Sequence, residues 1–519
     1  MSMGRVARSW LDAMLPSSGA GSMRRCYART GPDSDGGDGV SGRIGLPAGR
    51  RVVWDGRVRL LGGLFGAASV VLGGAPWGVL RIAPAGRRFV RRLYAAGGDG
   101  LVPEAGVESA VADLLVRRGV AHPVAAPGPV DTLEVVVPAY DNAQHLDACL
   151  DSLRAANPGV RIIVVDDASH SPAVGEVAAA HGATYVRHDR NRGPAAARNT
   201  GLRKVGTPLV AFVDADCVVT PGWLETLTGH FDDPRVAAVA PRITARISTT
   251  GVLARYEAAR SALDMGPRPQ LVTHGAPLGY LPSAALVARR ECLPEFDERL
   301  RLGEDVDLVW RLVDDGHLVR YEPAAMVTHE MRHEPARWAG RIFDYGTSAA
   351  ELDRRHPGRL APARLSVFNV AAAALLLNRH RGAALAVIAL SAARLAATLR
   401  ASSVDLSAVP TVLGKTLASD ADSAGHLLRR EWWPIGWLAL AGMRRWRVAR
   451  AAAAVMLLAR VREWLTRRPD VDLPRYLALR LAEDAAYGSG VIVGAVRARR
   501  PQVLLPHLRL PRAAQKPNH

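Results

Sequence analysis

The 519-residue sequence predicts an α/β protein with a mostly parallel central sheet, preceded by a small module and followed by an Ala/Arg-rich helical region. Short β-branched runs alternate with helical stretches between residues 131 and 358, as is typical of βαβ units. Apolar residues make up 49% of the chain, which is enough for several hydrophobic cores. The formal charge of +18 is concentrated in residues 359–519, where apolar helical runs lie among 25 basic and 9 acidic residues.

Residues 1–45 are rich in Gly, Ser, Asp and Arg and show no periodicity, so we expect them to be disordered. This segment has no apolar core of a secretory signal peptide. The four cysteines are scattered without a CxxC pair, which argues against a zinc ribbon or a disulfide scaffold; they are Cys26, Cys149, Cys217 and Cys292. Such cysteine usage favours a reducing compartment, and we expect a cytoplasmic protein.

Residues 46–124 are expected to form a winged-helix-like module. An Asp-Gly turn within residues 51–61 predicts a hairpin, and apolar residues recur at helical spacing over 78–97 and 108–124. Modules of this kind bind DNA, or bind peptides along a strand edge or helix groove. The apolar stretch 60–80 is long enough to span a membrane, but its six glycines and its proline favour turns instead.

After a linker over 125–131, four strands are expected in the α/β region, with helices between them; the strands cover 133–138, 160–165, 183–187 and 208–213. In open sheets of this kind, ligands bind beyond the carboxyl ends of the strands. Polar segments stand at three such ends, namely PAYDN, DDAS and DAD. The ligand site is therefore expected where these three segments meet.

The first two segments suit a nucleotide. Backbone groups from Pro138 to Tyr140 can face a base, and Asp166 or Asp167 can accept a hydrogen bond from a pyrimidine N3–H. The third segment, with Asp214 after a buried apolar run, suits a cation instead.

Asp214 and Asp216 follow the apolar run VAFV, where an unpartnered carboxylate is costly to bury. Mg²⁺ and Mn²⁺ prefer oxygen ligands and are commonly held by one or two carboxylates together with substrate phosphates. The pair therefore predicts a divalent cation that bridges a diphosphate. The alternative is that both acids cap the helix that begins near Thr220.

Two further segments carry charged residues at predicted helix starts. Arg198 lies in NRGPAAARNTGL, where a helix N-terminus favours anions and the arginine can bind phosphate; an ordinary exposed arginine is the alternative. RLGEDVDLVWRL places Glu304, Asp305 and Asp307 at the start of a helix, whose dipole keeps a carboxylate ionised. Such a carboxylate can be a general base, and N-capping is the competing interpretation.

These segments, in this order, resemble the inverting family-two glycosyltransferases of GT-A fold. RHDRNRGPAAARNTGL, LPSAALVARR and YGTSAAELDRRHPG more narrowly resemble the mycofactocin biosynthesis glycosyltransferases. The likeness runs from about residue 50 to the C-terminal helices, and residues 1–45 depart from it. It implies transfer of β-1,4-linked glucose, with UDP-glucose as donor, to a peptide-derived redox cofactor, and peptide recognition by the N-terminal module.

The resemblance also implies roles for individual residues. Asp305 would be the general base, and Arg198 would assist the diphosphate. Mg²⁺ or Mn²⁺ would be held by Asp214 and Asp216, with His329 completing the shell as in some relatives; a core or surface histidine is the alternative. The implied nucleotide contacts are Pro138, Tyr140, Asp166, Asp167 and Asp214.

The basic region 359–519 contains four apolar helical runs, at 366–378, 383–399, 432–443 and 451–459. Each is shorter than the roughly 20 residues of a membrane span or is interrupted within that length. The pattern fits helices on an anionic membrane surface, or a soluble bundle with an arginine-rich face. Nucleic-acid binding is not expected, because no reading-helix motif accompanies the charge.

Three other functions compete with the enzyme described by the resemblance. A nucleotidyltransferase would need a Gly-rich phosphate loop after the first strand, where PAYDN stands. A non-enzymatic DNA-binding or sugar-nucleotide-binding protein would not need both the DAD and the GED segments. A membrane-associated glycosyltransferase of cell-envelope polysaccharide synthesis would account for the basic apolar tail.

Overall fold

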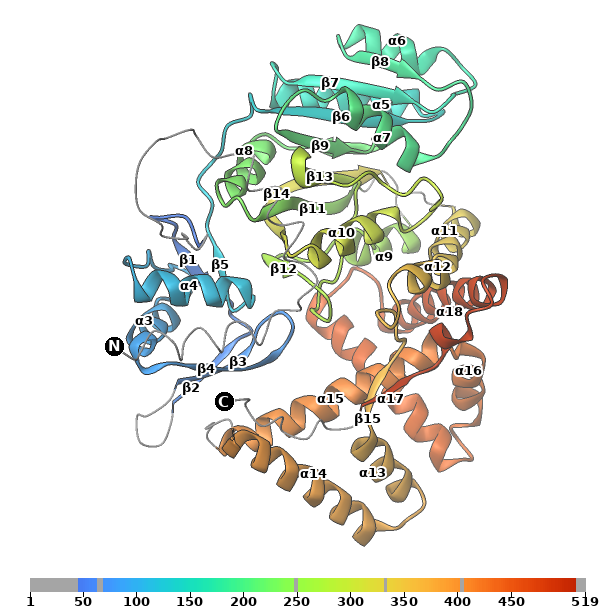
Figure 1. The fold of residues 1–519 in the computed structure, drawn as a ribbon. Coiled ribbons are helices and arrows are strands. Elements are labelled where there is room, and N and C mark those ends of the chain that lie inside the picture. Colours follow the sequence, from blue (N-terminus) through green and yellow to red (C-terminus); the bar gives the residue numbers. More distant parts are fainter. Residues whose placement is uncertain (1–44, 63–68, 247–250, 331–333, 402–405, 510–519) are drawn as a thin grey trace.

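The structure is a computed structural model that describes residues 45–62, 69–246, 251–330, 334–401 and 406–509. The expected disorder of residues 1–45 lies almost wholly outside the described residues. Figure 1 shows an α/β region, a small N-terminal module beside it and a set of C-terminal helices that contacts both. Three cysteines lie among the described residues, and all three are buried; they are Cys149, Cys217 and Cys292.

The α/β region is built on a nine-stranded mixed sheet with the order β10-β14-β11-β13-β9-β6-β7-β8, and β12 pairs with β14. The four predicted strands are confirmed to within a residue or two at their ends, and they are mutually parallel. The bounds of the strands are β6 Leu133–Ala139, β7 Arg161–Asp166, β8 Thr184–Arg187, β9 Leu209–Val213, β10 Cys217–Val219, β11 Val236–Arg246, β12 Gln270–Val272, β13 Ala285–Arg289 and β14 Leu318–Glu330.

The expectation of a mostly parallel sheet holds only for its first half. β13 lies antiparallel between β9 and β11, and β10 and β12 pair antiparallel with β14. These pairings join segments far apart in the chain, which local sequence pattern does not specify. The sheet is therefore mixed, as in a GT-A-like domain.

Two hydrophobic cores cover the faces of the sheet, because alternate residues of a strand point to opposite sides. Val135 and Val137 of β6 pack into one core, and Val136 packs into the other. The helices around the sheet are α5 Ala143–Ala156, α6 Ala173–Ala180, α7 Pro194–Lys204, α8 Trp223–Thr228, α9 Val252–Arg260, α10 Glu304–Asp314, α11 Pro335–Thr347 and α12 Ala349–Arg355.

The N-terminal module contains two small sheets and two helices. β1 pairs with β5, and β2, β3 and β4 form an antiparallel sheet. The helices α3 and α4 share one core with these strands. The bounds are β1 Val52–Trp54, β2 Arg59–Gly62, β3 Ser69–Gly73, β4 Gly78–Ile82, α3 Arg87–Ala96, α4 Val107–Arg117 and β5 Ala121–Pro123.

The predicted hairpin over residues 51–61 is wrong. The backbone N–H of Asp55 donates to Val120, and its carboxylate accepts from Arg57 and lies 3.1 Å from His122 Nε2, so the chain turns away. The strand before Asp55 consequently pairs with β5 and the strand after it with β3.

The helical predictions in the module are only partly confirmed. Residues 78–82 are strand, and the first helix begins at Arg87 after Pro84; the second ends at Arg117. Within 60–80 the described residues form strands and a turn, not a spanning helix.

The linker and the module pack closely on the α/β region. The Gly128 N–H donates to the Glu225 carbonyl. Buried Arg235 donates to Asp113 of α4 at 2.6 Å and also to Asp233. The two parts are therefore joined by a buried polar contact.

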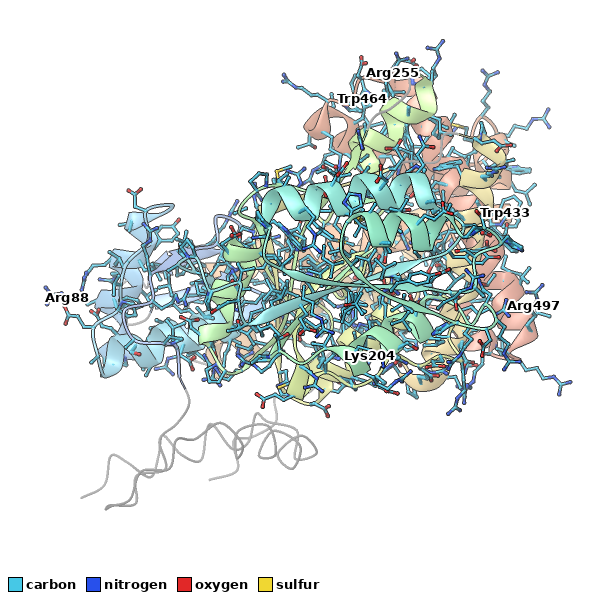
Figure 2. All side chains as sticks on the ribbon, turned by 90° about the horizontal axis from the view of Figure 1, so that it is seen from above. Arg88, Lys204, Arg255, Trp433, Trp464 and Arg497 are labelled. Atoms are coloured by element: carbon cyan, nitrogen blue, oxygen red, sulfur yellow. The ribbon has the colours of Figure 1, made fainter. Side chains whose placement is uncertain are left out.

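The described part of the C-terminal region contains six helices, among them a long α18 that packs along α11. Figure 2 shows Trp464 of α17 beside Arg255 of α9, so the bundle also contacts the α/β region there. β15 and β16 form a short parallel pair. The bounds are β15 Arg364–Ser366, α13 Val367–Leu377, α14 Arg381–Ala401, α15 Ala408–Arg429, α16 Trp433–Gly442, α17 Arg447–Arg467, α18 Leu473–Arg497 and β16 His507–Arg509.

One expectation about this region is wrong. The run predicted over 383–399 extends to a 20-residue apolar helical segment, Arg381–Arg400, with a mean hydropathy of 1.8. Within the described ranges it is the one helix long and apolar enough to cross a membrane. Arg394 lies within this segment, whose mean hydropathy remains high enough for a span in spite of that charge.

The close crossing of α11 and α18 generates a stability prediction. A Cβ at Gly346 would overlap the carbonyl oxygen of Tyr487 and lie 2.9 Å from the Val491 nitrogen, whereas a Cβ at Gly340 on the same helix would meet nothing within 4 Å. We expect Gly346→Ala to lower the free energy of unfolding by about 1–3 kcal/mol, as overpacking does. Gly340→Ala, the control, should raise it by up to about 1 kcal/mol. Denaturant unfolding would measure both free energies. Equal changes in the two variants would contradict a close contact between α11 and α18 at Gly346.

Candidate active site

The predicted ligand segments lie together at one edge of the sheet. β6 and β7 are in parallel register, with Ala139 opposite Asp166. The Asp167 N–H donates to the Ala139 carbonyl, which joins the loops that follow these strands. Asp214 follows β9, the other neighbour of β6. The convergence expected from strand–helix alternation is thus present.

Asp166 lies fully buried beneath this edge. Its carboxylate accepts hydrogen bonds from Ser169, Tyr185 and Arg187. Burial opposes ionisation, but the hydrogen bonds, first those from Ser169 and Tyr185, lower the pKa of Asp166. The base of a nucleotide could reach this carboxylate only after displacing the half-exposed Tyr185 and Arg187. The sequence analysis did not predict that these two residues contact Asp166.

Asp167 is also engaged within the protein. Its carboxylate accepts from the backbone N–H groups of Arg192 and Gly193, and one oxygen lies 2.7 Å from His188 Nδ1. These bonds fix the loop before α7. The direct nucleotide contacts expected of Asp166 and Asp167 remain a prediction, since both carboxylates have protein partners here.

The surface at the end of β6 is more open. Pro138 is buried within the strand, whereas Tyr140 is 43% exposed, and its ring lies 6.0 Å from that of His170. Asp141 has a left-handed φ of 48° and accepts from the backbone N–H of His170. Tyr140 and His170 therefore offer an exposed aromatic edge beside the strand end.

Arg198 joins the two acidic segments. It is 3% exposed and donates to Asp214 at 2.7 Å and to Glu304 at 2.9 Å. Burial would lower the pKa of Arg198, but the carboxylates of Asp214 and Glu304 more than offset it and raise that pKa. The geometry makes Arg198 a positioning residue, not an exposed phosphate ligand.

Asp216 and His329 lie next to each other. Pairing of β10 with β14 places Cys217 opposite His329, and His329 Nε2 lies 3.2 Å from an oxygen of Asp216. His329 Nδ1 is buried and has no hydrogen-bond partner in the structure. Two carboxylates and an imidazole are suitable ligands for Mn²⁺ or Mg²⁺, although Asp214 is turned towards Arg198.

A different group already has the spacing of metal ligands. Among the described residues, the ligand atoms of Asp147, Asp151 and His181 lie within 4.8 Å of one another. Both acids are exposed, and nothing else at this position indicates a ligand. This group is useful as a control for the predicted site.

Asp305 is the first-turn residue of α10 next to Glu304. Burial, and then the charge of Glu304, raise the pKa of Asp305 to about 7, while the Val306 N–H and Arg198 oppose this shift. The Val306 N–H donates to the carboxylate at 2.8 Å. A carboxylate with a pKa near neutrality is well matched to general-base catalysis.

Four residues near Asp305 form a group that we call the aromatic wall, namely Tyr280, Tyr345, Tyr487 and Arg430. The charge of Asp305 acts on Tyr280 and Tyr345, and Tyr487 and Arg430 lie beside Tyr280. Tyr280 and Tyr345 are 37% and 38% exposed. Burial, followed by the charge of Asp305, raises the pKa of Tyr280 to about 12. The Arg430 guanidinium lies 3.2 Å from the centroid of the Tyr487 ring. The wall combines the α/β region with α11, α18 and the end of α15, and sequence pattern gave no signal for it.

Comparisons with known proteins identify the family of this chain. Glycosyl transferase family 2 matches residues 134–291. The chain is 38% identical over 480 residues to the pre-mycofactocin glycosyltransferase of Mycobacterium tuberculosis, covering 89% of this chain and 99% of that protein. It is 28% identical over 203 residues to the succinoglycan biosynthesis protein ExoU of Rhizobium meliloti, covering 37% and 59%.

Among solved structures, the chain is similar to the mannosyltransferase PcManGT from Pyrobaculum calidifontis, in complex with GDP-Man and Mn²⁺. The TM-score is 0.40 at 18% identity, and the match covers 72% of this chain and 89% of that one.

The buried position of Arg198 generates a prediction. Arg198→Lys keeps the positive charge, but one ammonium cannot reproduce the planar donors that bind both Asp214 and Glu304. We therefore expect kcat to fall at least tenfold, which corresponds to ~1.4 kcal/mol or more for breaking a buried network of ion pairs. The control is Arg203→Lys on the same helix, whose ion pair with Glu295 is exposed, and it should change kcat little. Equal kcat values for the two variants would contradict the role of Arg198.

Proposed function

Because the chain belongs to the pre-mycofactocin glycosyltransferases, within the family-two glycosyltransferases, we propose that it transfers glucose from UDP-glucose to a peptide-derived redox cofactor with inversion at the anomeric carbon. The observation that carries this proposal is the connection of Asp214 and Glu304 through Arg198, with Asp305 beside them. This arrangement supports a diphosphate-binding role for Asp214 and a base role for Asp305 in one site.

The donor binds at the edge formed by the ends of β6, β7 and β9. Tyr140 and His170 stack against the base or ribose, because both rings are accessible at the end of β6. Asp166 and Asp167 hold the loops that shape this surface. Asp214, Asp216 and His329 would hold Mg²⁺ or Mn²⁺, which when bound neutralises charge on the diphosphate.

Asp305 acts on the acceptor. Its carboxylate accepts the proton of the acceptor hydroxyl as that oxygen attacks the anomeric carbon. The new carbon–oxygen bond forms on the face opposite the nucleoside diphosphate, whose bond to the same carbon breaks with the electron pair leaving on the diphosphate. A single displacement of this kind inverts the anomeric centre. The pKa of Asp305, about 7, allows the carboxylate to take up this proton near neutral pH.

The aromatic wall binds the acceptor beside this base. Tyr280, Tyr345 and the stacked pair of Arg430 and Tyr487 present flat faces, which suit sugar rings and aromatic groups. The Nε of Arg430 lies 3.9 Å from a carboxylate oxygen of Glu431, and the Arg430 side chain is 26% exposed. The exposed part of its guanidinium can donate to an acceptor oxygen.

The N-terminal module, residues 46–124, acts as a winged-helix-like element that recognises the peptide part of the acceptor. In the described sheet β2-β3-β4, β4 lies at an edge and can add a peptide strand. Trp77 and Val79, next to and within β4, are both more than a third exposed. They offer apolar contacts beside that edge.

A second function, synthesis of cell-envelope polysaccharide at the membrane, has one observation in its favour. The apolar helix α14 is largely exposed, as expected of a membrane-associated enzyme. The family membership favours the cofactor as acceptor.

The deciding experiment incubates the purified protein with a panel of sugar nucleotides and either pre-mycofactocin or oligosaccharide acceptors. Mass spectrometry should show addition of hexosyl groups to pre-mycofactocin with UDP-glucose, and NMR should show a β-linkage formed from the α-linked donor. Transfer to the oligosaccharides alone would support the second function.

A prediction tests the base. Asp305→Asn keeps the shape of the side chain but cannot accept the proton, so we expect kcat to fall by about 10²–10⁴-fold with nucleotide affinity nearly unchanged. In the wild type, activity should decline as pH falls through about 7, because protonation removes the base. A loss of less than about threefold would refute the assignment.

The same variant has a stability signature that shows it is folded. The pKa of Asp305 is higher in the folded than in the unfolded protein, so the folded state binds this proton more tightly. The resulting contribution to the free energy of unfolding is present at low pH and is lost as pH rises through about 7. Asp305→Asn should therefore melt at a higher temperature than the wild type at about pH 9, and at a similar temperature at about pH 4. Thermal unfolding at the two pH values measures this.

A further prediction tests the metal site. We expect a chelator to stop glycosyl transfer and Mn²⁺ or Mg²⁺ to restore it. Asp216→Ala should abolish transfer and should also remove the increase in nucleotide affinity that the metal causes, as measured by calorimetry. Asp147→Ala, in the exposed acidic group, is the matched control and should retain both. Full activity in excess chelator, or an effect confined to Asp147→Ala, would overturn the assignment.

A further inference from the structure

The α13–α14 hairpin, Val367–Ala401, lies at the lower end of the molecule in Figure 1, away from the sheet. Its two helices pack on each other, and the end of α14 packs on the N-terminal module. Most of the apolar surface of the hairpin has no partner in the described chain. Only 11% of the most apolar stretch of Arg381–Arg400 is buried.

Large apolar side chains are exposed along both helices. Leu385 and Leu390 are 65% and 53% exposed, and Val370, Leu376 and Ile388 are also exposed. A helix that is apolar on all sides is normally enclosed by a protein core or by lipid. An apolar surface of this extent marks an interaction site.

The charges of the hairpin are all positive. Arg379 and Arg381 stand at the turn between the helices, and Arg394 and Arg400 lie on α14. From Arg359 to Val404 the sequence contains no aspartate or glutamate. A surface of apolar side chains whose charged neighbours are all cationic is complementary to a bilayer with anionic headgroups.

The connections of the hairpin exclude a simple crossing. α13 has 11 residues, which at 1.5 Å per residue is only about half of a ~30 Å hydrocarbon core. Both ends return to the protein, because β15 before α13 pairs with β16 and Leu399 near the end of α14 packs with Val70 and Leu72 of β3. With arginines at the turn and along α14, the hairpin fits the boundary between headgroups and acyl chains.

We propose that the α13–α14 hairpin docks the enzyme on an anionic membrane surface, lying along the bilayer with its leucines in the acyl region and its arginines among the headgroups. Because the hairpin lies away from α10 and the sheet in Figure 1, docking places the reaction at the membrane without taking part in the chemistry.

The test is flotation of the full chain with vesicles of phosphatidylcholine alone or with added phosphatidylglycerol. We expect binding to the anionic vesicles that weakens with salt. The double variant Arg379→Gln/Arg381→Gln should weaken this binding by about fivefold per arginine. Leu385→Gln/Leu390→Gln should weaken it by about tenfold or more, because less apolar surface enters the bilayer.

The control is Val102→Gln/Val107→Gln, which replaces two similarly exposed apolar residues of the N-terminal module and should leave binding unchanged. Glycosyl transfer to a soluble acceptor should be retained by the arginine and leucine variants of the hairpin, which shows that they are folded. Absence of binding to anionic vesicles would overturn the proposal. So would a dimer in analytical ultracentrifugation that the leucine variant alone dissociates, because the hairpin would then be covered by a second copy.

Discussion

Arg198 lies beneath the candidate active site and donates hydrogen bonds to Asp214, at the end of β9, and to Glu304, at the start of α10. A buried guanidinium needs such partners, and each partner is held in turn by the arginine. The segment that would bind the metal is thereby fixed relative to the segment that carries Asp305. Because Glu304 stands next to Asp305, the same ion pair also influences the pKa of the base.

The C-terminal helices complete this site. Tyr487 of α18 and Arg430 at the end of α15 stack on each other beside Tyr280, which together with Tyr345 lies near Asp305. Their position depends on the close approach of α11 and α18, where Gly346 contacts the backbone near Tyr487. The same region reaches the N-terminal module through α14 and α15, which cover one face of β3. The three parts of the chain therefore pack on one another.

Local pattern in the sequence was sufficient for the first half of the sheet and for the convergence of Asp214 with the ends of β6 and β7. The runs that form β6, β7, β8 and β9 are β-branched and parallel, so their carboxyl ends meet at one edge. Pairings between distant segments were not predictable in this way. The insertion of β13, the failed hairpin at Asp55 and the aromatic wall all depend on such contacts.

Site roles were harder to predict than site positions for the same reason. Asp166 stands where the sequence placed it, but Tyr185 and Arg187, about 20 residues away, occupy its carboxylate. Arg198 lies near the start of α7, but its side chain is buried because it donates a hydrogen bond to Glu304, 106 residues away. A motif specifies where a side chain emerges from the fold, whereas its partners come from tertiary structure.

The charges around Arg198 suggest how binding of the donor would affect the residue proposed to act on the acceptor. Three carboxylates, Asp214, Glu304 and Asp305, act on the buried Arg198, and Asp216 lies two residues from Asp214, so an anionic diphosphate is repelled unless a cation accompanies it. A cation held by Asp214 and Asp216 would leave less of the field of Arg198 balanced by Asp214 and more of it acting on Glu304 and Asp305. The pKa of Asp305 should then fall, because its charge is better compensated. Arrival of the donor would thus favour the ionised base, and the arginine that fixes the geometry would also couple donor binding to activation of the acceptor.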